Sequence, residues 1–435
     1  MSEILIPPST NRPYEKTKLA NGVRVVTGRM EGVRSASLIM GYNVGSRIEP
    51  APIAGIAHYL EHMLFKGTER RPDPLTISQE IESVGGILNA GTGRENTSYW
   101  VKVPGTQLPL AFDVLADMLR NSTFDPNELE KERSVIFEEI RAIQDIPEDL
   151  VHDLIDQLVW GDDPIGRDVA GTEETVANID RETMLEFFHR NYGADRLVIA
   201  AAGDVDHDSV VAMTEEFFGD LPVTINPHVN TPVAITQNEK RIHIETRDTE
   251  QAHLTIGFPA VSYFDERRYA QSTIESILSS GMSSRLFQEL REKRGLVYSV
   301  FGYFRSYEDA GQGVIYAGTD TGRVKESIEA IMGELKKLRD VPVSKDELER
   351  TKTLRKGRLL MSLEDSRSVA CWIGSQESTY GFIETPEELM EHIDAVTAED
   401  VQSLANDLLQ EKLLNLVLIG PYSREKEYLP LLTLE

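Results

Sequence analysis

The order of predicted strands and helices occurs twice along this 435-residue chain. In the first half, apolar periodicity predicts strands at residues 23–26, 36–40, 87–90, 98–103 and 196–202, and helices at 53–65, 78–84, 108–120, 126–143 and 207–218. In the second half it predicts strands at 252–257, 297–304, 313–317 and 415–419, and helices at 269–278, 323–338 and from 344 onward. A repeat of about 200 residues restricts the chain to two copies of one domain plan.

Each copy mixes strands with amphipathic helices, and such helices need a sheet face against which to bury their apolar side. We therefore expect an α+β fold made of two homologous α+β domains, each a mostly antiparallel sheet packed against helices. The predicted boundaries are an N-terminal domain at 1–221, a proline-containing linker at 222–242 and a C-terminal domain at 243–435.

Composition excludes several classes of partner. Acidic residues outnumber basic ones by 72 to 45, and the net charge of −27 argues against binding to nucleic acid or to an anionic membrane. The longest apolar runs, residues 197–202 and 416–419, are much shorter than the roughly 18 residues that a membrane helix needs. Cys371 is the only cysteine, so neither an intramolecular disulfide nor a cysteine metal cluster is expected. Residues 1–11 show no signal or transit peptide, and a cytoplasmic location is the expectation.

The segment of residues 58–62 carries the clearest chemical pattern. On a helix, His58 and His62 lie about 40° apart, so both imidazoles can reach one metal ion. Glu61 is offset by about 60° from His58, close enough to the ion to act on a water without being a ligand. This spacing is that of the inverted zinc-hydrolase motif, which predicts a zinc site with Glu61 as general base.

A catalytic zinc usually has three protein ligands, so a third is expected from a neighbouring element. In the helix predicted at 126–143, Glu132 and Glu139 lie within about 20° of each other, on the face that carries Leu129, Val135, Ile136 and Ile143. A carboxylate on an apolar face needs a cation or a proton. We therefore predict Glu139 as the third ligand and Glu132 as an outer acid that orients a histidine or a substrate water.

Simpler explanations exist for these residues. A five-residue histidine and glutamate pattern also arises by chance on a helix surface, and Glu132 has Lys131 and Arg133 beside it for an ordinary solvated ion pair. The apolar surroundings of both histidines and the second pair of carboxylates favour the metal site.

The second copy lacks this chemistry. Aligning residues 60–64 with 274–278 places Ser272 at the position of His58 and Ser276 at that of His62. Aligning 128–130 with 347–349 likewise places Thr351 at Glu132 and Arg358 at Glu139. One copy is therefore predicted to be catalytic and the other to support it.

With these residues, the chain resembles the pitrilysin, insulin-degrading and mitochondrial processing peptidase family of zinc metallopeptidases, and most of all its half-size processing-peptidase branch. The segment from Val44 through Gly55 and His58 to Thr68 is similar to the signature of that family, and Glu139 follows His62 by 77 residues, as the family requires of its third ligand. The resemblance covers essentially the whole chain.

The resemblance implies further site residues. Arg291 and Tyr298 are similar to the family pair that holds a substrate carbonyl and stabilises the oxyanion, although Gly295 interrupts any helix between them. Without the family, they would be taken as a surface arginine and a core tyrosine. Asn89, Ala90, Gly91 and Thr92 resemble the edge strand on which the family lays its peptide substrates.

The resemblance also implies an activity and a partner. The predicted function is a zinc-dependent endopeptidase, with one Zn²⁺ per chain, that hydrolyses short or unfolded peptides inside an enclosed chamber. Because the family carries the arginine and tyrosine on the half opposite the metal, a half-size chain is expected to pair, as a homodimer or as a heterodimer with a related chain. The alternatives are a subunit that is active only with a distinct partner chain, and a non-catalytic scaffold or chaperone subunit.

Overall fold

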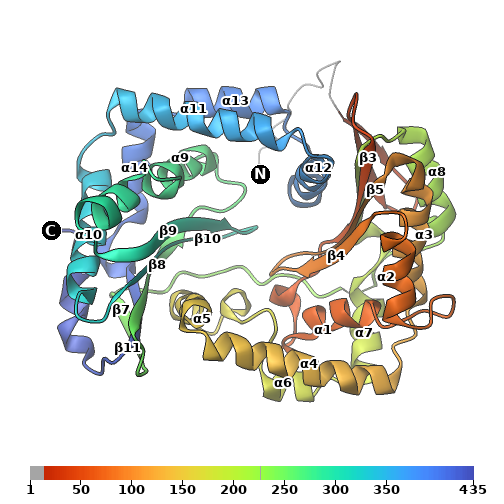
Figure 1. The fold of residues 1–435 in the computed structure, drawn as a ribbon, viewed down its shortest axis with the longest axis horizontal. Helices are drawn as coiled ribbons and strands as arrows, with labels where there is room; N and C mark the ends of the chain where they lie inside the picture. Colours follow the sequence, from red (N-terminus) through yellow and green to blue (C-terminus); the bar gives the residue numbers. More distant parts are fainter. Residues whose placement is uncertain (1–13, 226) are drawn as a thin grey trace.

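The computed structural model describes residues 14–225 and 227–435, which form two β-sheets flanked by helices (Figure 1). The first sheet has the order β1-β2-β6-β3-β5-β4, with β1 Glu15–Lys18, β2 Arg24–Arg29, β3 Ser35–Tyr42, β4 Ile87–Thr92, β5 Thr97–Pro104 and β6 Leu197–Gly203. The second has the order β7-β11-β8-β10-β9, with β7 Arg241–Thr246, β8 Gln251–Ala260, β9 Val297–Ser306, β10 Gly311–Asp320 and β11 Asn415–Gly420.

The two sheets share one topology. Each contains a single parallel pair, β2 with β6 and β7 with β11, and all other pairings are antiparallel. The remaining strands follow in the same order, and β4 and β9 end the sheets at corresponding edges. Among the described strands, β1 alone has no counterpart in the other sheet. The predicted duplication and the predicted α+β fold are therefore confirmed.

Fourteen α-helices are found in the part of the chain that the structure describes. In the first half these are α1 Ile56–Leu64, α2 Pro74–Glu82, α3 Leu108–Asn121, α4 Pro126–Asp145, α5 Pro147–Trp160, α6 Glu173–Ala177, α7 Arg181–Asn191 and α8 His207–Phe218. In the second half they are α9 Arg268–Ser279, α10 Val324–Asp340, α11 Lys345–Ser362, α12 Ser366–Tyr380, α13 Pro386–Ala395 and α14 Ala398–Leu408.

Several predicted bounds were wrong. The helix expected at 53–65 begins only at Ile56, because Ala51–Ile53 form a 3₁₀ turn and Gly55 adopts a φ of 96°. The helix expected at 78–84 is α2, which starts earlier because the Asp73 side chain caps its N-terminus. In the linker predicted at 222–242, the described residues up to 240 form neither helix nor strand, but Arg241 and Ile242 already belong to β7. Residues 1–13, including the stretch analysed for a targeting signal, lie outside the described residues.

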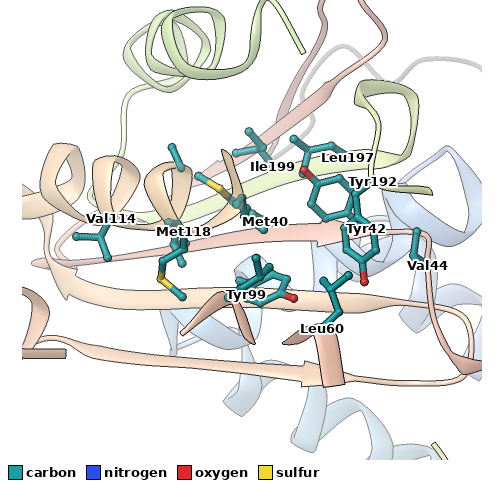
Figure 2. Close-up of a cluster of buried hydrophobic side chains, with 14 of the residues drawn as sticks. Met40, Tyr42, Val44, Leu60, Tyr99, Val114, Met118, Tyr192, Leu197 and Ile199 are labelled. Carbon is teal, nitrogen blue, oxygen red and sulfur yellow. The ribbon is translucent and has the colours of Figure 1, made fainter. Parts of the chain in front are cut away.

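The core of the first half lies between its sheet and α1 and α3. Figure 2 shows Met40 and Tyr42 of β3 meeting Tyr99 of β5 and Leu60 of α1, and all four side chains are buried. A helix packed on this face holds His58 and His62, the predicted ligands, in a fixed orientation relative to the sheet.

Each sheet is covered on its other face by a helix from the opposite half. Helix α5 of the first half packs on β8 and β11, and α12 of the second half packs on β2, β3 and β6. Strands β6 and β11 are thus buried along their whole length, which explains the two apolar runs in the sequence. Among the described residues, no helix is both long and apolar enough to cross a membrane.

Buried ion pairs fix the two halves to each other. Arg47, 2% exposed, pairs with Glu95 of the β4–β5 turn and with Asp309 of the β9–β10 turn, at 2.5 and 2.6 Å. Asp156 of α5 pairs with both Arg94 and Arg305, each at 2.6 Å. The spacing between the sheets is therefore determined by interactions within one chain.

Candidate metal centre

Three predicted ligands come together at the junction of α1 and α4. The Nε2 atoms of His58 and His62 are 3.2 Å apart, and the Oε2 atom of Glu139 lies 3.9 and 3.6 Å from them. The ligand atoms of all three residues lie within 4.8 Å of one another.

The geometry of this cluster fits a tetrahedral ion. Two nitrogen ligands bound at about 2.0 to 2.1 Å to a tetrahedral zinc stand about 3.3 to 3.4 Å apart. The separation of the two Nε2 atoms is close to that value, and the carboxylate oxygen needs to move by only a few tenths of an ångström. Two imidazoles and one carboxylate are a donor set that zinc accepts, and they leave one position open.

The N-terminus of α1 is anchored by a residue that sequence reasoning missed. The buried carboxyl of Glu49 accepts hydrogen bonds from the backbone N–H groups of Gly55 and Ala57, at 2.7 and 2.8 Å. At Gly55, a Cβ atom would lie 2.4 Å from the carbonyl oxygen of Ala170, so only glycine fits there. These contacts fix the start of the helix one turn before His58.

Helix α4 supplies the carboxylates. It begins at Pro126, where the Asp125 side chain accepts from two backbone N–H groups. Glu132 Oε1 is 2.8 Å from His62 Nδ1, and Glu132 Oε2 is 2.5 Å from Lys66 Nζ. A carboxylate can only accept, so His62 donates from Nδ1 and its Nε2 lone pair is directed at the ion site.

The alternative of an ordinary surface ion pair at Glu132 is wrong. Lys131 pairs with Glu128, Arg133 pairs with Glu130, and Glu132 is 6% exposed. Lys66 lies just past the end of α1, two residues after Leu64, and no periodicity could have paired it with a residue 66 positions later. It was missed for that reason.

The predicted apolar face of α4 needs a correction. Leu129, Ile136 and Ile140 are buried, but Val135 is 44% exposed and so is the side chain of Glu139. The buried face of α4, formed by Leu129, Ile136 and Ile140, is centred to one side of Glu132 and Glu139. Both glutamates lie at the edge of this face, so Glu132 is enclosed while Glu139 reaches the solvent-facing site.

The electrostatics keep one imidazole neutral. Burial and the neighbouring His62 lower the pKa of His58 to about 4, so this side chain is unprotonated near neutral pH and free to bind a metal. Burial opposes protonation of His62, but the hydrogen bond with Glu132 and the charge of Glu139 outweigh burial and raise the pKa. Burial likewise opposes ionisation of Glu132, yet its bonds to His62 and Lys66 hold its pKa below the usual range.

Glu61 is connected to the edge strand β4. Its Oε2 accepts a hydrogen bond from the Thr92 hydroxyl at 2.5 Å. Burial raises the pKa of Glu61, and the Thr92 bond partly opposes that rise. Among the described strands, β4 pairs only with β5, so the edge formed by Asn89, Ala90, Gly91 and Thr92 is free beside the metal ligands.

The corresponding positions of the second half hold no ligand set. The hydroxyls of Ser272 and Ser276 donate to carbonyl groups of their own helix, and so does that of Thr351. These oxygens are already used within α9 and α11.

Arg291 and Tyr298 lie together, away from the metal ligands. The Arg291 guanidinium is 5.6 Å from the centre of the Tyr298 ring, and Tyr298 is 75% exposed, so it is not a core tyrosine. Gly295, with a φ of 54°, separates the two elements that carry them. No hydrogen bond, ion pair or ring contact of the described residues joins either side chain to the three ligands.

Comparison with known proteins identifies the family of the chain. Residues 24–173 match the insulinase family, peptidase family M16, and residues 178–355 match the peptidase M16 inactive domain. The chain belongs to peptidase family M16. An uncharacterized zinc protease of Streptomyces coelicolor is 38% identical over 93% of this chain and 89% of its own length. Another from Bacillus subtilis is 38% identical over 92% of this chain and 97% of its own.

Solved structures show the same fold. A protease from Helicobacter pylori superposes with a TM-score of 0.87 at 21% identity, covering 94% of this chain and all of that one. A structure titled as a peptidase M16 inactive domain, from Pseudomonas fluorescens, gives 0.85 at 20% identity, covering 94% and 98%. The insulinase match contains His58, His62 and Glu139, and the inactive-domain match contains Ser272, Ser276 and Thr351. The second match starts at residue 178 and so includes β6 and α8, which belong to the first half of the duplication.

Proposed function

We propose that this M16 chain is a zinc-dependent endopeptidase, with one Zn²⁺ held by His58, His62 and Glu139. The convergence of the two Nε2 atoms and one carboxylate oxygen beside a free strand edge is the observation that carries the proposal. A zinc ion held there would polarise the scissile carbonyl and lower the pKa of a water toward about 7. Relatives named zinc proteases support this assignment.

The protein's own residues have distinct roles in this proposal. The edge of β4 from Asn89 to Thr92 binds the peptide main chain by strand addition. Glu61 removes a proton from the attacking water and transfers it to the leaving amine. Glu132 is a positioning residue, since it acts through His62.

Arg291 and Tyr298 of a second chain would complete the site, with Arg291 holding the substrate main chain and Tyr298 donating to the oxyanion. We therefore propose a homodimer that encloses a chamber for short or unfolded peptides. The division at 1–221, 222–242 and 243–435 assigns catalysis to the first domain and this pair to the second. Only Cys371 is present, which suits a reducing compartment such as the cytoplasm.

The metal assignment is tested by zinc content and peptide cleavage in His58→Ala, with His189→Ala as the control because His189 is exposed and outside the cluster. We expect His58→Ala to lose both zinc and cleavage and the control to keep both. Full zinc content in His58→Ala would contradict the assignment.

The pairing is tested by mixing two inactive variants, Glu61→Gln and Tyr298→Phe. If Tyr298 serves the partner's site, mixed dimers contain one intact site, and about a quarter of the wild-type activity should return. No recovery after subunit exchange would contradict the shared site. If cleavage activity returned only when a different, related chain was added, the heterodimer would be favoured. If every combination of chains bound zinc without cleaving the peptide, the scaffold alternative would be favoured.

A further inference from the structure

A cavity of about 650 Å³ lies between the two halves, on the face of α9 that corresponds to the metal-binding face of α1. Its wall includes Ser272 and Glu275, the counterparts of His58 and Glu61, and Arg355 of α11. The opposite wall is the β4–β5 turn, residues 93–96, of the first half. The duplicated chain has thus kept a cleft at the degenerate site although the metal ligands are gone.

Most charged groups around this cavity are already paired. Arg94 and Arg305 share Asp156, Glu95 pairs with Arg47, and Glu384 accepts from Tyr269 and His392. Among the described residues, three lining groups have no oppositely charged partner within ion-pair distance: Arg268, Arg355 and Glu275.

The two arginines make only neutral contacts. Arg355 donates to the carbonyl of Tyr269 and to the Thr273 hydroxyl, and Arg268 donates to the hydroxyl of Tyr269 and the carbonyl of Asp265. Burial lowers the pKa of Arg355 to about 10, against the opposing charge of Glu275. A partly buried guanidinium with no carboxylate within ion-pair distance is unfavourable, and a bound anion would reduce that cost.

Two further lining residues have polar atoms without partners. Gln376, 8% exposed, has no hydrogen-bond acceptor for its Nε2, and Tyr307, 6% exposed, has no partner for its hydroxyl. Buried donors of this kind are usually satisfied, so each favours an acceptor in the cavity. The three unpaired charges sum to one positive charge, which a single carboxylate neutralises.

The cavity continues the free edge of β4. This strand ends at Thr92, and the turn that directly follows it forms one wall. A peptide added to the edge beside Asn89–Thr92 that extends past Thr92 therefore reaches the cavity.

We propose that this cavity binds one carboxylate of a peptide lying along β4, through Arg268 and Arg355 with Gln376 and Tyr307 as further donors. The peptide part of this inference depends on the proposed function. The carboxylate is either the C-terminus of the peptide, which requires the peptide to run parallel to β4, or an Asp or Glu side chain, which does not. In a protein with a net charge of −27, such a site selects a carboxylate that the rest of the surface repels.

The test is binding of labelled peptides to the full-length, zinc-loaded Glu61→Gln chain, measured by fluorescence anisotropy. Three peptides of one sequence are compared: a free C-terminus, an amidated C-terminus, and an amidated form with Glu near its end. We expect at least one carboxylate form to bind at least about tenfold more tightly than the neutral amide, which is what a single charge-assisted hydrogen bond at the weak end of its range contributes. The form that binds more tightly shows whether the carboxylate comes from the C-terminus or from an acidic side chain.

Arg268→Gln and Arg355→Met should each reduce this preference to about onefold, whereas Arg424→Gln, an exposed arginine paired with Glu427, should retain it. Arg355 joins α11 to Tyr269 and Thr273 of α9, whereas Arg268 donates only to Asp265 and Tyr269 near it in the chain. The Arg268 variant therefore remains informative if the Arg355 variant does not fold. Equal binding of all three peptides, no binding of any, or a preference that survives in Arg268→Gln would overturn the proposal. Wild-type zinc content and cleavage are measured separately, so this failure is distinguishable from failure of the peptidase.

Discussion

Replacing Glu132 with glutamine tests how the metal centre is held. The substitution keeps the size of the side chain but removes the charge that faces His62 Nδ1 at 2.8 Å and Lys66 Nζ at 2.5 Å. The amide can present its NH₂ to His62, which would favour the tautomer with a proton on the metal-facing Nε2. Lys66 would also lose its carboxylate partner.

Loss of such an outer partner typically costs about 10- to 100-fold in metal affinity. That factor corresponds to about 1.4 to 2.8 kcal/mol of zinc binding free energy. We expect Glu132→Gln to weaken zinc binding by this amount while the fold remains intact, as measured by competition with a chromophoric chelator.

Glu130→Gln is the matched control. Glu130 lies on the same helix, its side chain is 67% exposed, and among the described residues its ion pair is with Arg133, whose side chain is 12% exposed. The solvent-exposed carboxylate of Glu130 contacts none of the three predicted ligands, so its loss should not affect zinc affinity. The reasoning would be refuted if Glu132→Gln bound zinc as tightly as the wild type, or if both variants lost affinity equally.

Three other predictions follow from the described contacts. Because the Thr92 hydroxyl lowers the pKa of Glu61, Thr92→Val should raise that pKa and move the acidic limb of the pH–activity profile to higher pH; an unmoved limb would argue against Glu61 as the base. Arg47→Met leaves two carboxylates without their buried partner and should lower the free energy of unfolding by about 3 kcal/mol. The control Arg70→Met, at an exposed pair, should change this free energy by less than about 1 kcal/mol. Equal losses for the two variants in chemical denaturation would contradict the prediction. Burial raises the pKa of Glu49 to about 8, so its stabilising contribution is fully present below the ordinary carboxyl pKa and is lost as the pH rises through 8. Over this pH range, the unfolding free energy of Glu49→Gln should therefore fall less than that of the wild type. Identical pH dependence in the two proteins would refute the raised pKa of Glu49.

The parts of the site that the sequence predicted are those set by local periodicity. His58, Glu61 and His62 lie on one helix, and the spacing of Glu132 and Glu139 places both at one border of α4, so helical geometry alone brings each group together. The pairing of Glu132 with Lys66, and of Glu49 with the start of α1, depends on how separate elements pack, and no spacing in the sequence reports it.

Helix α12, which the apolar periodicity did not predict, was missed because of how it packs. Helix α12 buries Ser366, Gly374, Gln376 and Glu377 together with its apolar residues, so its buried face does not follow the usual apolar stripe. It covers the sheet of the other half, as α5 does in return. The two-domain plan was predictable from the repeat, but the exchange of covering helices was not, because it arises from tertiary packing.

The most direct test of the central claim is hydrolysis of a quenched, arginine-containing peptide by wild type and by Glu61→Gln, each shown to contain one zinc per chain. General-base catalysis typically contributes about 10²- to 10⁴-fold, so we expect the variant to lose at least a hundredfold in rate while keeping its metal. Equal rates at equal zinc content would contradict the assignment of Glu61 and, with it, the mechanism proposed for this metal centre.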